Sequence, residues 1–147
     1  MTDFGPAGGP GGSPFDDAAP AQMEIGELHI RSDQFINQLQ VIYRNPVNGQ
    51  VTPSPTHGGN GGQLTVITLN PGEFIIEING RAGKVVDSLL VRTNQGRIFS
   101  NLGGNGGENP FRFHLDIGSG EEIFGFSGRS GLLLDAIGVH TRPRTSH

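Results

Sequence analysis

The 147-residue sequence predicts an all-β domain of three four-stranded units packed about a pseudo-threefold axis. Two repeated patterns indicate three units. The run Gly-Gly-x-Gly-Gly occurs three times, at 8–12, 58–62 and 103–107. The spacing Gly-x-x-x-Asp occurs at 83–87 and 131–135, and an altered copy stands at 33–37. Successive copies lie about 50 residues apart, whereas a propeller requires at least four blades and a solenoid requires shorter repeats.

The distribution of glycine and proline also favours many short strands. The 25 glycines and 10 prolines gather in short runs between segments rich in Ile, Val, Leu and Phe. No window keeps a 3.6-residue period over ten residues, so we expect roughly 10–12 short strands. One domain is expected over residues 1–147, with its core in 4–143 and a frayed tail at 144–147. Residues 1–22 look disordered by composition, although they contain the first glycine run.

Each unit supplies its strands in order along the chain. In the first unit Leu28 and Ile30 lie on one face of a strand. In the next strand Leu39, Val41 and Tyr43 alternate with Gln38, Gln40 and Ile42. Turn residues such as Asn48-Gly49 and Asn94-Gln95-Gly96 separate the strands. The segments expected as strands are 26–31, 38–43, 64–69, 74–78, 89–91, 97–99, 111–115, 123–126 and 136–143.

Several function classes are excluded by composition. The net charge of −4 comes without a basic tract, so no nucleic-acid partner is expected. No apolar run approaches 18 residues, so no membrane span is expected. The absence of a signal-like N-terminus predicts a cytoplasmic protein or one released without a signal peptide. There is no cysteine, the five histidines lack metal-ligand spacing, and no Gly-Lys-Ser/Thr follows a glycine run. We therefore expect no metal and no cofactor.

The repeated parts suit recognition of a polyhydroxylated ring. Glycine runs expose backbone N–H groups and let another molecule approach closely. A nearby carboxylate accepts hydrogen bonds from hydroxyl groups. Strand-like runs follow Asp87 and Asp135 and would hold both carboxylates on rigid structure. Together these features predict a shallow platform for a hexose.

The same motifs resemble the jacalin-related lectins. The resemblance rests on Phe4 to Gly12, on Asn94 to Phe99, and on Gly-x-x-x-Asp followed by Ala136-Ile137-Gly138, in that order, over about residues 4–143. It implies a β-prism of three Greek-key sheets that binds sugars without metal. Three glycine loops in one chain are most similar to the griffithsin-like members. The first glycine loop is continuous with Met1, which favours the mannose/glucose class over the galactose class. The resemblance also implies a possible homodimer.

The resemblance also implies three candidate carbohydrate sites. In each, an acidic or amide side chain faces one glycine loop, and we rank Asp135 first, Asp87 second and Asn37 third. The implied binding residues are Asp135, Leu133, Leu134, Gly131, Gly11 and Gly12 at the first site, Asp87, Val85, Val86, Gly83, Gly106 and Gly107 at the second, and Asn37 and Gly62 at the third.

This chain departs from the three-site pattern at identifiable positions. The three-site members carry a tyrosine two residues before the aspartate, where this chain has Leu133, Val85 and Phe35. In the first unit Asp33 replaces the glycine and Asn37 replaces the aspartate, which removes a charge and one acceptor oxygen. The Asn37 site is therefore expected to be weak or empty.

Two other functions stay open beside a non-enzymatic lectin that recognises mannose/glucose-containing glycans. A glycosidase would need two carboxylates across one bond, which placement in separate units argues against. The missing tyrosines motivate the other alternative, a β-prism kept as a protein-interaction module without sugar binding.

Overall fold

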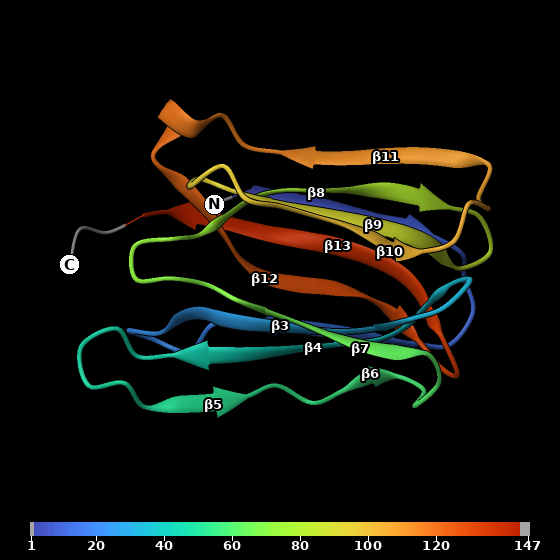
Figure 1. Cartoon of the computed structure of the whole chain (residues 1–147), viewed down its shortest axis with the longest axis horizontal. Coiled ribbons are helices and arrows are strands. Elements are labelled where there is room, and N and C mark those ends of the chain that lie inside the picture. The colour runs from blue at the N-terminus through green and yellow to red at the C-terminus, as the bar shows by residue number, and fades with distance from the viewer. Residues whose placement is uncertain (1, 145–147) are drawn as a thin grey trace.

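The computed structural model describes residues 2–144 and folds them into three antiparallel sheets (Figure 1). Each sheet follows one plan, in which a long central hairpin is flanked on both sides by outer strands. Sheet A joins the two ends of the described chain. Its strand order is β1 (Thr2–Gly8), β13 (Leu134–Pro143), β12 (Glu121–Ser130) and β2 (Ser13–Ala18).

Sheets B and C are each built from one continuous stretch of chain. Sheet B has the order β5 (Val51–Pro53), β4 (Ile36–Arg44), β3 (Glu24–Ser32) and β7 (Gln63–Thr68), and β6 (His57–Gly58) also pairs with β4. Sheet C has the order β10 (Ile98–Gly103), β9 (Val86–Thr93), β8 (Ile75–Ala82) and β11 (Asn109–His114). A single 3₁₀ turn, η1 (Ile117–Ser119), precedes β12. The predicted all-β prism of three sheets is confirmed, with one outer strand of sheet B split into two pieces.

The core lies between the three sheets and is made by the alternation seen in the sequence. Leu28 and Ile30 of β3 are 1% and 0% exposed, and they pack in one cluster with Ile78 of β8 and Ile137 of β13. Each such side chain contributes roughly 1.5–3 kcal/mol by its burial. Because all three sheets turn their apolar faces inward, the loops at the two ends of the prism remain free to carry polar groups.

Residues 1–22, which look disordered by composition, are structured from residue 2 onward. β1 pairs with β13 and β2 pairs with β12. His140 contacts Asp3 and Asp16, at 2.6 Å each, and thereby links both outer strands to the centre of sheet A. The composition misleads because the partners of this segment lie more than a hundred residues away. These strands place the first glycine run beside the hairpin that carries Asp135.

The expected tail at 144–147 lies outside the described residues from 145 onward. Arg144 itself is held in place. Its backbone N–H donates to the Gly120 carbonyl at 2.7 Å, its guanidinium donates to Glu122, and it lies 4.1 Å above the Phe74 ring. Among the described residues no helix is long and apolar enough to cross a membrane.

Candidate functional site

The three glycine loops lie at one end of the prism, on the right in Figure 1, and each crosses the turn of a central hairpin. The strand registers explain this placement. In sheet A, Gly8 pairs with Ala136 and Ser13 pairs with Ser130, so the loop between them spans the β12–β13 turn. The same relation holds for the loops of sheets B and C. The end of each hairpin is therefore covered by a loop in which every residue but the central one lacks a side chain.

At the first site Asp135 faces the loop formed by residues 8–12. The Gly9 N–H donates to the Asp135 carbonyl at 3.0 Å. A Cβ atom on Gly11 would lie 2.7 Å from Asp135 Oδ2, and one on Gly12 would lie 2.8 Å from Oδ1. Both distances are shorter than a van der Waals contact, so side chains at Gly11 and Gly12 would collide with the carboxylate. Leu134 is 0% exposed, so its side chain belongs to the core and not to the surface of this site.

At the second site Asp87 faces the loop formed by residues 103–107 in the same way. The Gly104 N–H donates to the Asp87 carbonyl at 3.0 Å, and Cβ atoms on Gly106 and Gly107 would lie 2.9 and 3.0 Å from the carboxylate oxygens. Asp87 is 6% exposed. Burial raises the pKa of its carboxyl above the usual value, and the charge of Arg81 partly offsets that rise. A hollow of about 310 Å³ opens at this carboxylate.

The third site contains Asn37 and the loop formed by residues 58–62. The Gly59 N–H donates to the Asn37 carbonyl at 2.9 Å, and a Cβ atom on Gly62 would lie 2.7 Å from Asn37 Oδ1. The side chain is buried, and within residues 2–144 its Oδ1 has no hydrogen-bond partner. An amide supplies one acceptor and one donor where a carboxylate supplies two acceptors and a charge. The structure thus keeps the geometry of the other two sites and changes the chemistry.

Asp33 occupies the place of a glycine without strain. Gly83 and Gly131, at the equivalent positions, have φ values outside the left-handed region, so the backbone there does not require glycine. Asp33 also stabilises its own turn, because its Oδ1 accepts the Phe35 N–H at 3.2 Å and its N–H donates to the Phe35 carbonyl at 3.0 Å. Gly83 and Gly131 make the same backbone bond in their turns, so the replacement adds only the side-chain bond to the turn that carries Phe35.

An arginine holds each glycine loop, a feature that the sequence analysis missed. Arg129 donates to the carbonyls of Gly11 and Gly12 at 3.0 and 2.9 Å. Arg81 donates to the Gly107 carbonyl at 2.8 Å, and Arg31 lies 3.4 Å from the Gly62 carbonyl. Each arginine stands six residues before the Asp or Asn of its site, so its threefold repetition in the sequence could have revealed it.

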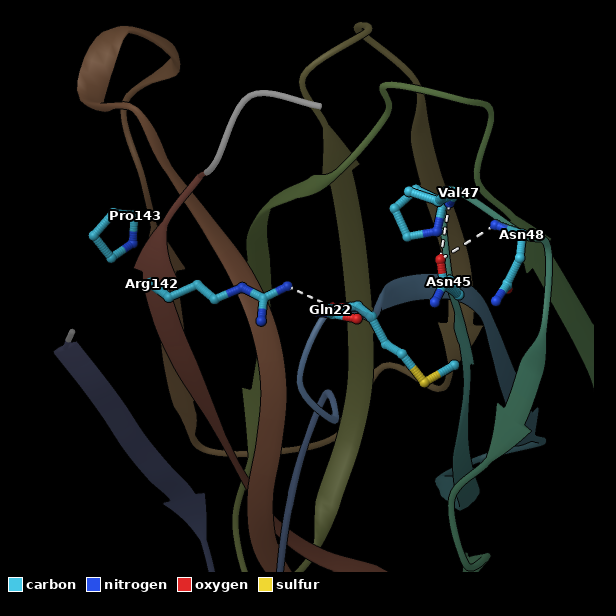
Figure 2. Close-up of a pocket in the computed structure, with 8 residues that line it drawn as sticks. Gln22, Asn45, Val47, Asn48, Arg142 and Pro143 are labelled. Atoms are coloured by element: carbon cyan, nitrogen blue, oxygen red, sulfur yellow. Dashed lines mark hydrogen bonds between the residues drawn. The ribbon is translucent and has the colours of Figure 1, made fainter.

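A further hollow lies at the opposite end of the prism, away from the glycine loops. It measures about 620 Å³ and is lined by Gln22, Met23, Asn45, Pro46, Val47, Asn48, Arg142 and Pro143. Figure 2 shows Arg142 reaching across it, where its guanidinium donates to the Met23 carbonyl at 2.7 Å. Asn45 Oδ1 accepts the backbone N–H groups of Val47 and Asn48. These polar groups stabilise the chain's own loops, so size alone does not make this hollow the functional site.

The described part of the chain contains no group of three or more His, Cys, Asp or Glu side chains that could hold a metal ion.

His57, beside the second glycine loop, stacks on Phe15 with ring centroids 3.9 Å apart and contacts Asp17. It therefore links sheets A and B.

Comparison with known proteins identifies the family. Residues 4–140 match the family model described as "Jacalin-like lectin domain". The chain belongs to the jacalin-related lectins. Horcolin from Hordeum vulgare is 33% identical over 145 residues, which cover 95% of this chain and 96% of horcolin.

Solved structures of this family share the fold closely. The mannose-binding lectin from champedak matches with a TM-score of 0.83 and 33% identity over 96% of each chain. Artocarpin in complex with mannotriose matches with a TM-score of 0.83 and 32% identity, over 96% of this chain and 97% of artocarpin. The jacalin-related lectins are carbohydrate-binding proteins, and these neighbours are mannose-binding members.

Proposed function

We propose that this jacalin-related lectin binds mannose- or glucose-type glycans at Asp135 and Asp87, without metal and without catalysis. One observation carries the proposal. At both sites the carboxylate oxygens lie within about 3 Å of the positions that Cβ atoms of the loop glycines would occupy. Any residue other than glycine would therefore fill the space beside the carboxylate. That space admits a hydroxyl group of a sugar, which can donate to the carboxylate while its ring rests on exposed backbone.

The roles of the other residues follow from their burial. Leu134 and Val86 are 0% exposed, so their side chains pack in the core and would not contact a sugar. Leu133 and Val85 are half-buried and would contact the sugar ring from the side. Asn37 would hold a sugar hydroxyl more weakly than either aspartate, because hydrogen bonds to an uncharged acceptor are weaker.

The arrangement supports binding rather than hydrolysis. A glycosidase needs two carboxyl groups placed about 5–10 Å apart on either side of one bond. Asp87 and Asp135 instead face separate glycine loops in separate sheets.

Single sites of this kind should be weak, and multivalency should supply the useful strength. A shallow site holding one hexose is expected to bind at about millimolar strength, a free energy near −4 kcal/mol. Because Asp135 and Asp87 each face a glycine loop, and these loops lie at one end of the prism (Figure 1), two arms of a branched glycan could engage one chain. Linked binding of this kind raises the overall affinity by roughly 10²–10⁴-fold when the geometry permits it.

The test is a titration with methyl α-mannoside of the Asp135→Asn, Asp87→Asn and double variants. Asparagine keeps the shape and removes the charge, so each single variant should lose one site and the double variant should lose both. Asp116→Asn is the matched control, because Asp116 is 89% exposed and far from the glycine loops. Unchanged binding by the folded double variant contradicts the assignment. Failure of the unaltered chain to bind any glycan on a broad array, with capture of a protein partner, would instead favour the interaction module.

A further inference from the structure

The structure assigns to the Asp87 site a wall that comes from a different sheet, namely the β3–β4 turn with Phe35 at its centre. We propose that Phe35 contacts the apolar face of a hexose held by Asp87, or an aromatic group attached to that hexose, and so sets the specificity of this site. The proposal rests on the proposed lectin function and adds a residue that the Gly-x-x-x-Asp pattern assigns to another site.

The hollow at Asp87 shows the two sheets meeting. Its lining combines Asp87 and residues 104–106 of sheet C with Gln34 and Phe35 from the turn of sheet B. Gln34 is exposed and Phe35 is half-buried. In sequence, Phe35 stands two residues before Asn37, and that spacing associates it with the Asn37 site. In space, Phe35 lines the hollow of the carboxylate that is 52 residues further along.

The ring of Phe35 is available to a ligand. Within residues 2–144 it makes no ring contact with another aromatic side chain. It is also absent from the half-buried apolar side chains that pack against the core, which include Phe4, Phe74 and Phe111. A half-buried phenylalanine that neither fills the core nor stacks on a neighbour leaves apolar surface facing the hollow. Such surface suits the C–H face of a pyranose ring or an attached aromatic ring.

Two contacts fix the turn in this position. A Cβ atom on Gly104 would lie 2.5 Å from the Gln34 carbonyl, so glycine at 104 allows the turn to close against the loop of sheet C. Asp33 accepts the Phe35 N–H through its side chain and so adds a hydrogen bond to the turn. Asp33, which replaces the glycine of the pattern in the first unit, thus supports the wall of the Asp87 site rather than its own Asn37 site.

The same packing recurs around the prism and makes the Asp87 site distinct. A Cβ atom on Gly9 would collide with the Lys84 carbonyl, and one on Gly59 would collide with the Leu132 carbonyl. Each glycine loop is thus bordered by the turn of another sheet. The residue equivalent to Phe35 is Val85 beside the Asp135 site and Leu133 beside the Asn37 site. An aromatic wall and a carboxylate therefore coincide at Asp87 alone among these three sites.

The experiment reads the two aspartate sites separately in the full chain. Amide resonances of Gly106 and Gly11 in ¹⁵N-labelled protein report the two Kd values during titrations with methyl α-mannoside and 4-nitrophenyl α-mannoside. We expect the nitrophenyl glycoside to bind more tightly than the methyl glycoside at Gly106 but not at Gly11. Phe35→Ala should raise the Kd for the nitrophenyl glycoside at Gly106 by about three- to tenfold and leave Gly11 unchanged.

Controls separate direct contact from loss of structure. Phe35→Tyr keeps the ring and should retain the affinity, whereas Phe35→Leu keeps apolar volume without the ring and should not. Val47→Ala is the control, because it removes an apolar side chain that is 86% exposed at the opposite end of the prism, and it should leave Gly106 unaffected. An unchanged Kd at Gly106 in Phe35→Ala, or an equal change at both sites, overturns the inference while the lectin function stands. No response of either amide to any sugar in the unaltered chain overturns both.

Discussion

The two ends of the prism use charged residues in opposite ways. At the end opposite the glycine loops, Glu73 is buried and accepts hydrogen bonds from Thr93 Oγ1 at 2.6 Å, from Arg97 Nε at 2.8 Å and from the Asn70 N–H. Glu122 likewise accepts from Arg142 and Arg144. At the glycine-loop end the arginines contact loop carbonyls instead, and the oxygens of Asp135 and Asp87 face glycine.

This difference shows how one fold separates stability from binding. A buried carboxylate surrounded by its own donors joins loops of neighbouring sheets and has little capacity left for a ligand. The Asp87 carboxylate is buried as well, but it borders glycines that bring no side-chain donor, and burial raises its pKa by more than the charge of Arg81 lowers it. Substitutions at the first end should therefore cost stability, and substitutions at the second end should cost binding.

Arg97→Ala should have the largest effect on stability. It removes two hydrogen bonds that Arg97 donates to Glu73, whose side chain is fully buried, and one that it donates to the Thr68 carbonyl. Leaving a buried carboxylate without its cation typically costs about 3–5 kcal/mol. We expect the free energy of unfolding in urea to fall by about 3 kcal/mol, with the affinity for mannoside in the folded protein unchanged. A similar loss of stability in Asp87→Asn would contradict the separation between the two ends.

Acidification should affect the two ends of the prism at different pH values, because Asp87 takes up a proton at a higher pH than Glu73 does. Hydrogen bonds from Arg97, opposed by burial, lower the pKa of Glu73 to about 2, so its stabilising contribution is fully present above pH 4.5 and is lost as the pH falls towards 2. Burial raises the pKa of Asp87 above 3.8, so this carboxylate takes up its proton while Glu73 is still charged. Protonation of Asp87 does not oppose folding, because its raised pKa favours the neutral folded form.

The measurement follows mannoside binding at the Gly106 amide and the melting temperature over pH 7 to 3. Binding at the Asp87 site should decline first, at a pH where the melting temperature has not yet fallen through loss of Glu73. The melting temperature of Asp87→Asn is the control, because it should show the same loss through Glu73 with no carboxylate at position 87 to titrate. If binding and melting temperature decline together, the two ends are not independent.

Much of this organisation could be predicted from the sequence, for a local reason. Glycine runs and the Gly-x-x-x-Asp spacing are short patterns. Three copies of the first, with two copies and one altered copy of the second, indicate three sheets and three loop–hairpin pairs. The strands of residues 2–18 could not be predicted in the same way, since their partners β12 and β13 lie at the other end of the chain. The position of Phe35 depends on how sheet B packs against sheet C, which no repeat spacing specifies. The arginines at 31, 81 and 129 were visible in the sequence and needed only the three units aligned.

Removal of these arginines should have the smallest effect on stability. It should also rank the three glycine loops by how strongly an arginine holds each of them. Arg129 makes two hydrogen bonds to its loop, Arg81 makes one at 2.8 Å, and Arg31 makes one at 3.4 Å. A hydrogen bond from a charged donor contributes about 1.5–3 kcal/mol when buried, and these exposed bonds should contribute about 1 kcal/mol or less. Gln substitution should therefore speed amide hydrogen exchange in the contacted loop most for Arg129, less for Arg81 and least for Arg31, with global stability almost unchanged. Mannoside affinity should weaken only at the site whose arginine is replaced, because a loosened loop must be ordered again on binding. Equal exchange rates in all three variants would mean that the glycine loops are held by strand register and packing, and that the arginines serve another purpose.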